Sequence, residues 1–155
     1  SPAVAGSWLA ARAGPELDPA TLLDVAGGAP LTALTYVDRE RWQRRRELVE
    51  CYDQVLAGRL DPIQAAESWA RGDLAENLRW LIGWHTDLIR LKMNSTPPHL
   101  SNPDLRSVLR RWADLQPLRA LFERWDAAVR LYTLCVTTQA STPLLLEAFL
   151  SDATR

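Results

Sequence analysis

The feature that most constrains the fold of this chain is a helix-start signature that occurs four times. A residue of capping type is followed at once by proline at Asp18-Pro19, Asp61-Pro62, Asn102-Pro103 and Thr142-Pro143. The first side chain can accept hydrogen bonds from free backbone N–H groups, and proline supplies a preset φ at the first helical position. Between these points apolar residues recur at intervals of three and four, which is typical of helices. No segment reads as a strand, so the sequence predicts an all-α fold.

The helix start and stop signals and the apolar spacing together predict nine helices. Gly27 can take the left-handed conformation that closes a helix, and Pro30 begins the next helix at once. Asp73 and Glu76 form a pair that resembles a capping box. Two prolines in series force residues 94–98 out of helical backbone. The expected helices are 3–12, 19–26, 30–36, 39–57, 62–71, 74–93, 103–115, 117–139 and 143–153.

The first three helices differ from the rest in how much core they can build. Residues 1–36 are fewer than the roughly 40 below which chains usually need disulfides, metal or a partner to fold alone. They read as the end of a larger domain, and the absence of an initiator Met or signal pattern at Ser1 favours an excised fragment. The remaining residues supply about five helices with apolar faces, enough for one helical bundle. We therefore expect two domains, 1–37 and 38–155.

Charge and cysteine content exclude several classes of function. The net charge is -1, from 18 basic and 19 acidic residues, which argues against a field that would capture nucleic acid or an anionic membrane. Cys51 and Cys135 have no neighbouring CxxC or histidine spacing, so reduced, packed thiols are favoured over a disulfide or a metal site. No apolar run approaches the roughly 20 residues of a membrane-spanning helix. We expect a cytoplasmic chain with no membrane contact.

Catalytic constellations are missing from the sequence. There is no glycine-rich phosphate loop, no nucleophile elbow, no HExxH and no cluster of histidines with carboxylates. We therefore expect no catalytic residue, no cofactor, no metal and no small-molecule substrate for this chain.

Arginines crowd the start of the long helix predicted at 39–57. They can be interpreted as a patch for phosphate backbones, or as a solvated or interdomain ion-pair face. The second interpretation is favoured because acidic residues interrupt the run and because basic charge at a helix N-terminus opposes the helix dipole. The arginines are Arg39, Arg41, Arg44, Arg45 and Arg46, with Arg41, Arg44 and Arg45 as the candidate face.

The last predicted helix is a candidate for a partner-binding surface. Three consecutive leucines cover more of the helix circumference than one narrow apolar stripe does, so at least one of them faces away from the bundle axis. Core packing is favoured over partner contact for any individual leucine, although the stretch as a whole is a plausible subunit interface, and two tryptophans elsewhere mark core or interface without deciding between them. The partner-binding candidates are Leu144, Leu145, Phe149, Trp112 and Trp125.

Apolar residues cover so much of the helix predicted at 74–93 that it needs neighbours on two sides. Trp80, Trp84 and Leu88 fall on one side of it, and others widen this face. We interpret it as the central helix of the bundle, with His85 and Lys92 in structural roles.

Three separated segments resemble the C-terminal third of the delta-prime subunits of bacterial DNA polymerase III clamp loaders. They are 22–34 (LLDVAGGAPLTAL), 80–93 (WLIGWHTDLIRLKM) and 142–150 (TPLLLEAFL), and 2–9 is similar to the helix that opens the last part of the family's lid domain. The resemblance implies the end of a lid domain followed by an all-helical collar. It implies a noncatalytic part of a DNA-directed DNA polymerase holoenzyme, with the gamma/tau and delta subunits as partners and with DNA contacted weakly or indirectly.

The resemblance also gives a meaning to the corner between the second and third helices. Relatives that hydrolyse ATP carry Gly-Ser-Leu-Arg-Asp-Ala-Leu at this element, and the equivalent run begins at Gly28 and contains Pro30. Leu31 aligns with the arginine that contacts phosphate, and leucine cannot bind phosphate. The resemblance therefore implies a degenerate nucleotide corner. The alternative for the whole chain is a stand-alone helical adaptor or nucleic-acid-binding module that uses the 39–46 face.

Overall fold

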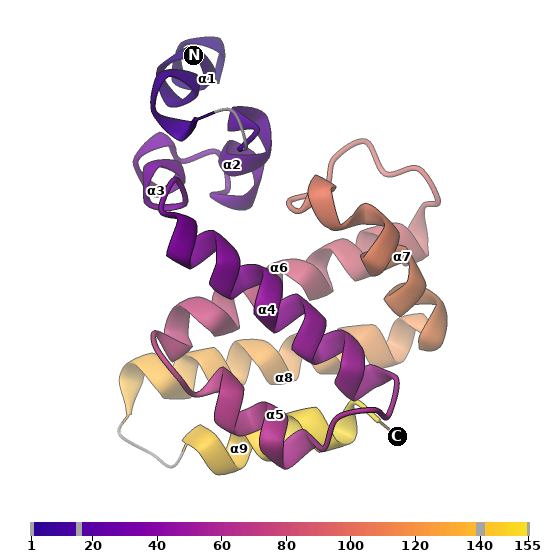
Figure 1. The fold of residues 1–155 in the computed structure, drawn as a ribbon. Coiled ribbons are helices and arrows are strands. Elements are labelled where there is room, and N and C mark those ends of the chain that lie inside the picture. The colour runs from indigo at the N-terminus through magenta and orange to yellow at the C-terminus, as the bar shows by residue number, and fades with distance from the viewer. Residues whose placement is uncertain (1, 15–16, 139–141, 155) are drawn as a thin grey trace.

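The computed structural model describes residues 2–14, 17–138 and 142–154. Within these ranges it contains nine α-helices, one 3-10 turn and no strand, so the all-α prediction is confirmed (Figure 1). The predicted end of the eighth helix at Gln139 lies outside the described residues. The elements are α1 (Pro2–Ala13), α2 (Pro19–Val25), α3 (Pro30–Thr35), α4 (Arg39–Leu56), α5 (Pro62–Trp69), α6 (Leu74–Met93), η1 (Pro103–Leu105), α7 (Arg106–Leu115), α8 (Leu118–Thr137) and α9 (Thr142–Asp152).

Two of the four start signatures cap their helices as the sequence predicts. The carboxylate of Asp18 accepts a hydrogen bond from the backbone N–H of Thr21, and that of Asp61 accepts one from Ile63. Gly27 has φ +64°, the left-handed conformation expected after α2. Thr142 already belongs to α9, so this helix begins one residue earlier than predicted.

The signature at Asn102-Pro103 has a different role from the predicted one. The side chain of Asn102 makes no cap hydrogen bond, and only the short turn η1 follows it before α7 begins at Arg106. Asn102 is buried, and its amide donates to Asp87 and accepts from Arg45. The expected helix at 103–115 is therefore divided into η1 and α7.

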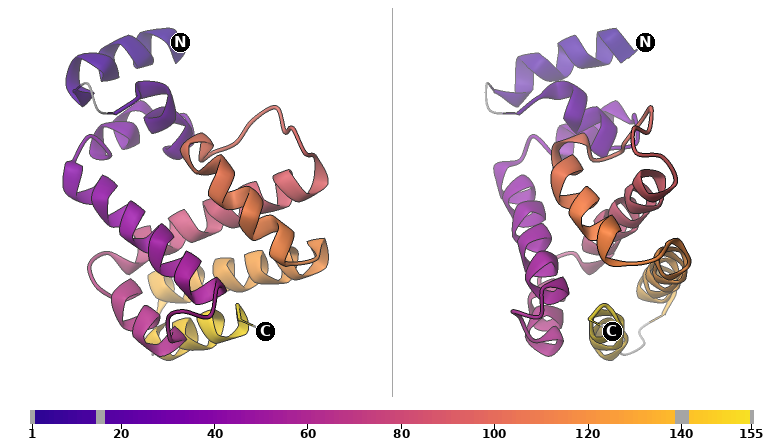
Figure 2. Two further views of the ribbon diagram at one scale, coloured as in Figure 1. Left: turned by 45° about the vertical axis from the view of Figure 1, so that its right-hand side comes forward. Right: turned by 90° about the vertical axis from the view of Figure 1, so that its right-hand side faces the viewer.

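The helices after Asp38 are arranged around α6. Both α7 and α8 pack along α6, α9 packs against α5 and α8, and α4 crosses the assembly (Figures 1 and 2). The small cluster of α1, α2 and α3 lies at the N-terminal end of α4, at the opposite end of the molecule from α9. Among the described residues this part contains six α-helices, one for each of the six ranges expected after residue 38, so the estimate of about five for the bundle is one too low.

A cluster of four aromatic rings forms the centre of the core. Tyr52 of α4, Trp69 of α5, Trp84 of α6 and Trp112 of α7 are buried, and neighbouring rings meet edge to face with centroids 5.1 to 6.3 Å apart. Burial of a large apolar side chain stabilises a fold by roughly 1.5–3 kcal/mol. Because each ring comes from a different helix, the cluster joins α4, α5, α6 and α7 in one core.

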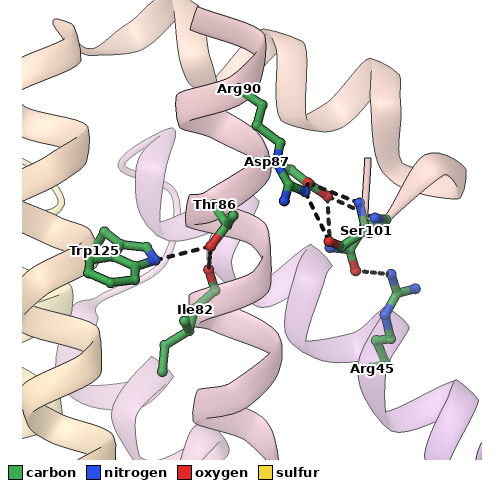
Figure 3. A network of polar contacts seen from close by, with 8 residues as sticks. Arg45, Ile82, Thr86, Asp87, Arg90, Ser101 and Trp125 are labelled. Carbon is green, nitrogen blue, oxygen red and sulfur yellow. Dashed lines mark hydrogen bonds and ion pairs between the residues drawn. The ribbon is translucent and has the colours of Figure 1, made fainter. Parts of the chain in front are cut away.

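A buried polar network joins α4 to α6 through the segment that precedes α7. Arg45 is fully buried, and its guanidinium donates to Asn102 at 2.7 Å and pairs with Asp104 at 2.7 Å. Asp87 accepts from the backbone N–H groups of Ser101 (3.0 Å) and Asn102 (2.8 Å). It also pairs with Arg90 at 2.9 Å, as Figure 3 shows.

Replacement of Asp87 by asparagine should destabilise the fold far more than its volume change suggests. The amide NH2 would face N–H donors where a carboxylate oxygen now accepts, and Arg90 would lose its counter-ion. We expect Asp87→Asn to lower the free energy of unfolding by about 2–4 kcal/mol in urea titrations followed by circular dichroism. The exposed Asp126→Asn on α8 is the matched control, with an expected change below about 0.5 kcal/mol. Equal stabilities of the two variants would contradict the network.

Candidate partner-binding site

A groove of about 990 Å³ lies between α8 and α9, next to the C-terminal end of α4. Its α8 wall includes Ala127, Leu131 and Leu134, whose spacing of three and four puts them on one face of the helix. Its α9 wall includes Leu145 and Ala148. The groove therefore has aliphatic walls with polar and charged side chains among them, which include Glu123, Arg130 and Asp152.

Arg124 of α8 lines the groove between these apolar walls. Its side chain donates to the hydroxyl of Tyr52 at 3.1 Å and to the backbone carbonyl of Phe149 at 3.3 Å, and its guanidinium stacks 4.4 Å from the Phe149 ring. Only 8% of its surface is exposed. Sequence reasoning missed Arg124, because nothing in its neighbourhood distinguishes it from the exposed arginines at 119 and 130.

Behind Arg124, a chain of hydrogen bonds continues into the core. The backbone carbonyl of Leu81 lies 2.9 Å from Nδ1 of His85 and can only accept, so this nitrogen carries the proton. Nε2 of His85 is then free to accept from the Tyr52 hydroxyl, 3.4 Å away. Burial, with a smaller contribution from the positive charge of Arg124, lowers the pKa of His85 from 6.5 to about 4, although the bond to the Leu81 carbonyl acts in the opposite direction. Burial likewise raises the pKa of Tyr52, so both groups are neutral at pH 7.

The five partner-binding candidates from the sequence separate into surface and core positions. Leu144 is 63% exposed and Leu145 is 42% exposed, and Leu145 lines the groove. Phe149 is buried on the groove side of α9. Trp112 is buried in the aromatic cluster, and the half-buried Trp125 donates to Thr86 of α6 at 3.0 Å. Of the five, Leu144 and Leu145 are exposed, only Leu145 and Phe149 line the groove, and the two tryptophans are not part of it.

The three candidate arginines of α4 donate to groups within the protein. Arg41 pairs with Glu76 at 2.8 Å, and this bond raises the pKa of Arg41. Arg44 donates to the carbonyl oxygens of Ser68 and Arg71. Arg45 is fully buried and therefore does not lie on a surface face. The carboxylate of Glu76 accepts from Arg41 and so forms an ion pair between α6 and α4. The carboxylate of Asp73 caps α6 by accepting from the backbone N–H of Glu76.

The remaining predicted features lie away from the groove. Gly28, Pro30 and Leu31 are exposed at the corner between α2 and α3, where Leu31 is 76% exposed. Cys51 and Cys135 are free and half-buried, and burial raises the pKa of Cys51. No helix in the described part of the chain is long and apolar enough to cross a membrane.

Comparison with known proteins identifies the family. Residues 39–154 match the model described as DNA polymerase III, delta subunit, C terminal. The chain belongs to this family.

A curated relative supports the same assignment. Over 111 residues the chain is 30% identical to the DNA polymerase III subunit delta' of Pseudomonas aeruginosa. This match covers 69% of this chain and 33% of that protein. The chain thus spans about a third of the length of this relative. The resemblance to the C-terminal part of delta-prime subunits is confirmed by the two matches together.

The buried His85 should make the stability of this family member depend on pH. Between pH 6.5 and about 4 the unfolded chain binds a proton on His85 and the folded chain does not, so stability falls as pH falls through this range. We expect His85 to account for a loss of about 2 kcal/mol between pH 7 and pH 5. The measurement is urea unfolding at several pH values for the native chain and for His85→Gln, which should lose this part of the slope.

The exposed His99, substituted as His99→Gln, is the matched control and should keep the native slope. Identical pH profiles for His85→Gln and the native chain would contradict a neutral, buried His85.

Proposed function

We propose that residues 38–155 form the collar that holds a DNA polymerase III clamp-loader subunit against its neighbours, and that residues 1–37 are the end of its lid domain. The family match begins at residue 39, beside the proposed boundary, and supports this division. The named relative, a delta' subunit, supports the clamp-loader context. The two parts are in contact, since Trp80 of α6 donates to the hydroxyl of Tyr36, 3.2 Å away.

The observation that carries this proposal is the exposed apolar edge of α9 beside an apolar groove. Leu144 and Leu145 face outward, whereas Leu146 is fully buried against the rest of the bundle. A short helix that packs its inner face and still presents two neighbouring leucines is typical of a chain that buries them against another subunit. The neighbours in this proposal are the gamma/tau and delta subunits.

The proposed role is noncatalytic and needs no cofactor. The parent assembly would be a DNA-directed DNA polymerase holoenzyme, in which this chain supplies a fixed attachment while other domains move. Leu31 at the α2–α3 corner offers no donor to a phosphate, which agrees with a lid that does not contact nucleotide.

Direct DNA binding by the α4 arginines is the weaker alternative. A phosphate-binding face presents accessible cations, and Arg41, Arg44 and Arg45 instead donate to Glu76, to backbone carbonyls, and to Asn102 and Asp104. The proposal therefore has DNA contacted weakly or through other subunits.

The test is assembly of the full-length subunit with its neighbours. Leu144→Asp combined with Leu145→Asp puts two charges on the proposed interface without touching the buried face of α9, so we expect co-purification with the other loader subunits to fall at least about tenfold. Met93→Asp, at the exposed C-terminal end of α6, is the control and should assemble normally. Normal assembly of the double variant would refute the α9 interface.

A further inference from the structure

Arg124 is a buried cation whose counter-ion is missing from the described part of the chain. No Asp or Glu oxygen among the described residues lies within 4.0 Å of its guanidinium. Its Nε–H is buried and has no hydrogen-bond partner. Two neutral oxygens, the Tyr52 hydroxyl and the Phe149 carbonyl, both accept from Nη2. A buried charge that is not paired is costly to a fold.

Arg45 is the other buried arginine of the described chain, and its Nε–H is also unpaired, but its charge is compensated by the carboxylate of Asp104. Its guanidinium bonds Asp104 through Nη1 and Nη2, and Asn102 through Nη2. Arg45 is enclosed in the core, whereas Arg124 lines an open groove. The difference indicates that the partner of Arg124 comes from outside the described chain.

The surroundings of Arg124 define the chemistry of that partner. Ala127, Leu131 and Leu145 are apolar parts of the groove wall, so a segment that brings a group to Arg124 can cover them with apolar side chains. The carboxylates that belong to the groove, Glu123 and Asp152, stay outside ion-pair distance of Arg124, and Glu123 pairs with Arg119 at 2.9 Å. One guanidinium balances the single charge of a carboxylate, whereas a phosphate brings up to two charges.

We propose that Arg124 binds a carboxylate presented by a neighbouring loader subunit, on an apolar segment that occupies the α8–α9 groove. The carboxylate accepts from Nη1 of Arg124, which is not enclosed and makes no hydrogen bond within the described chain, while apolar side chains beside it cover Leu145 and Ala148. This inference rests on the proposed function and deepens it, since it assigns the partner segment an Asp or Glu side chain flanked by aliphatic residues.

The direct test uses hexanoate as the probe and the ¹H–¹⁵N NMR signal of the Arg124 Nε–H as the readout, on the 155-residue chain. Hexanoate should move this signal downfield in a saturable titration and shift the amides of Leu145 and Ala148. Hexanamide, which has the same stem and no charge, should bind at least about tenfold more weakly. Equal effects of the two compounds, or no shift at Arg124, would overturn the proposal.

Three variants separate recognition from folding. Arg124→Gln should abolish the difference between hexanoate and hexanamide. Ala127→Trp fills the groove and leaves Arg124 in place, so it should abolish binding even if Arg124→Gln perturbs the core. Arg130→Gln, at an exposed groove position, is the matched control and should bind hexanoate within about twofold of the native chain. Native-like hexanoate binding by Ala127→Trp would place the carboxylate elsewhere and overturn the proposal.

Assembly assays of the full-length subunit distinguish failure of this inference from failure of the proposed function. If the Leu144 and Leu145 double variant loses assembly while Arg124→Gln and Ala127→Trp assemble normally, the interface stands and the carboxylate contact is wrong. If all three variants assemble normally, the proposed function fails as well. Loss of assembly in all three, with Arg130→Gln unaffected, is the result that the inference predicts.

Discussion

The buried polar network that joins α4, α6 and the segment before α7 is the constraint on which the rest of the structure depends. Arg45 and Asp87 are both fully buried, and each is stable there only because another charge and several hydrogen bonds compensate it. Satisfying these groups fixes residues 101–104 against α6 and α4. The position of α7 follows, and the aromatic cluster of Tyr52, Trp69, Trp84 and Trp112 closes around it. With α6 held in this way, α8 packs along one side of it, and α9 fills the angle between α8 and α5.

The contrast between this network and Arg124 connects stability with function. Both buried arginines leave their Nε–H unpaired, but the fold supplies Arg45 with the carboxylate of Asp104 and supplies no carboxylate of the described chain to Arg124. A buried charge without a counter-ion in an otherwise consistent fold marks a place where sequence has been selected for something besides folding. The position of Arg124, between apolar walls and beside the exposed leucines of α9, gives one surface with both the apolar area and the charge that a specific subunit contact needs.

The sequence predicts the local features of this fold well and the long-range polar contacts poorly. Proline after a capping residue and apolar spacing are local signals, so nine helices, the Gly27 helix end and the central place of α6 could be predicted. Asn102 could not be assigned, because a cap and a buried network use the same side chain. The partners of Arg124, Tyr52 and Phe149, are 72 and 25 residues away in the chain, and no spacing indicates them. Three successive leucines predict that at least one faces outward. Only the structure shows that Leu144 and Leu145 are the exposed ones and that Leu146 is buried.

Site-specific photo-crosslinking in the assembled clamp loader tests the central claim that the α8–α9 surface is where this chain meets its neighbour. A benzophenone amino acid at position 145 of the full-length subunit lies at the groove, and the same amino acid at position 93 lies at the end of α6. We predict that irradiation crosslinks position 145, and not position 93, to a neighbouring loader subunit. A crosslink from position 93 with none from position 145 would contradict the account.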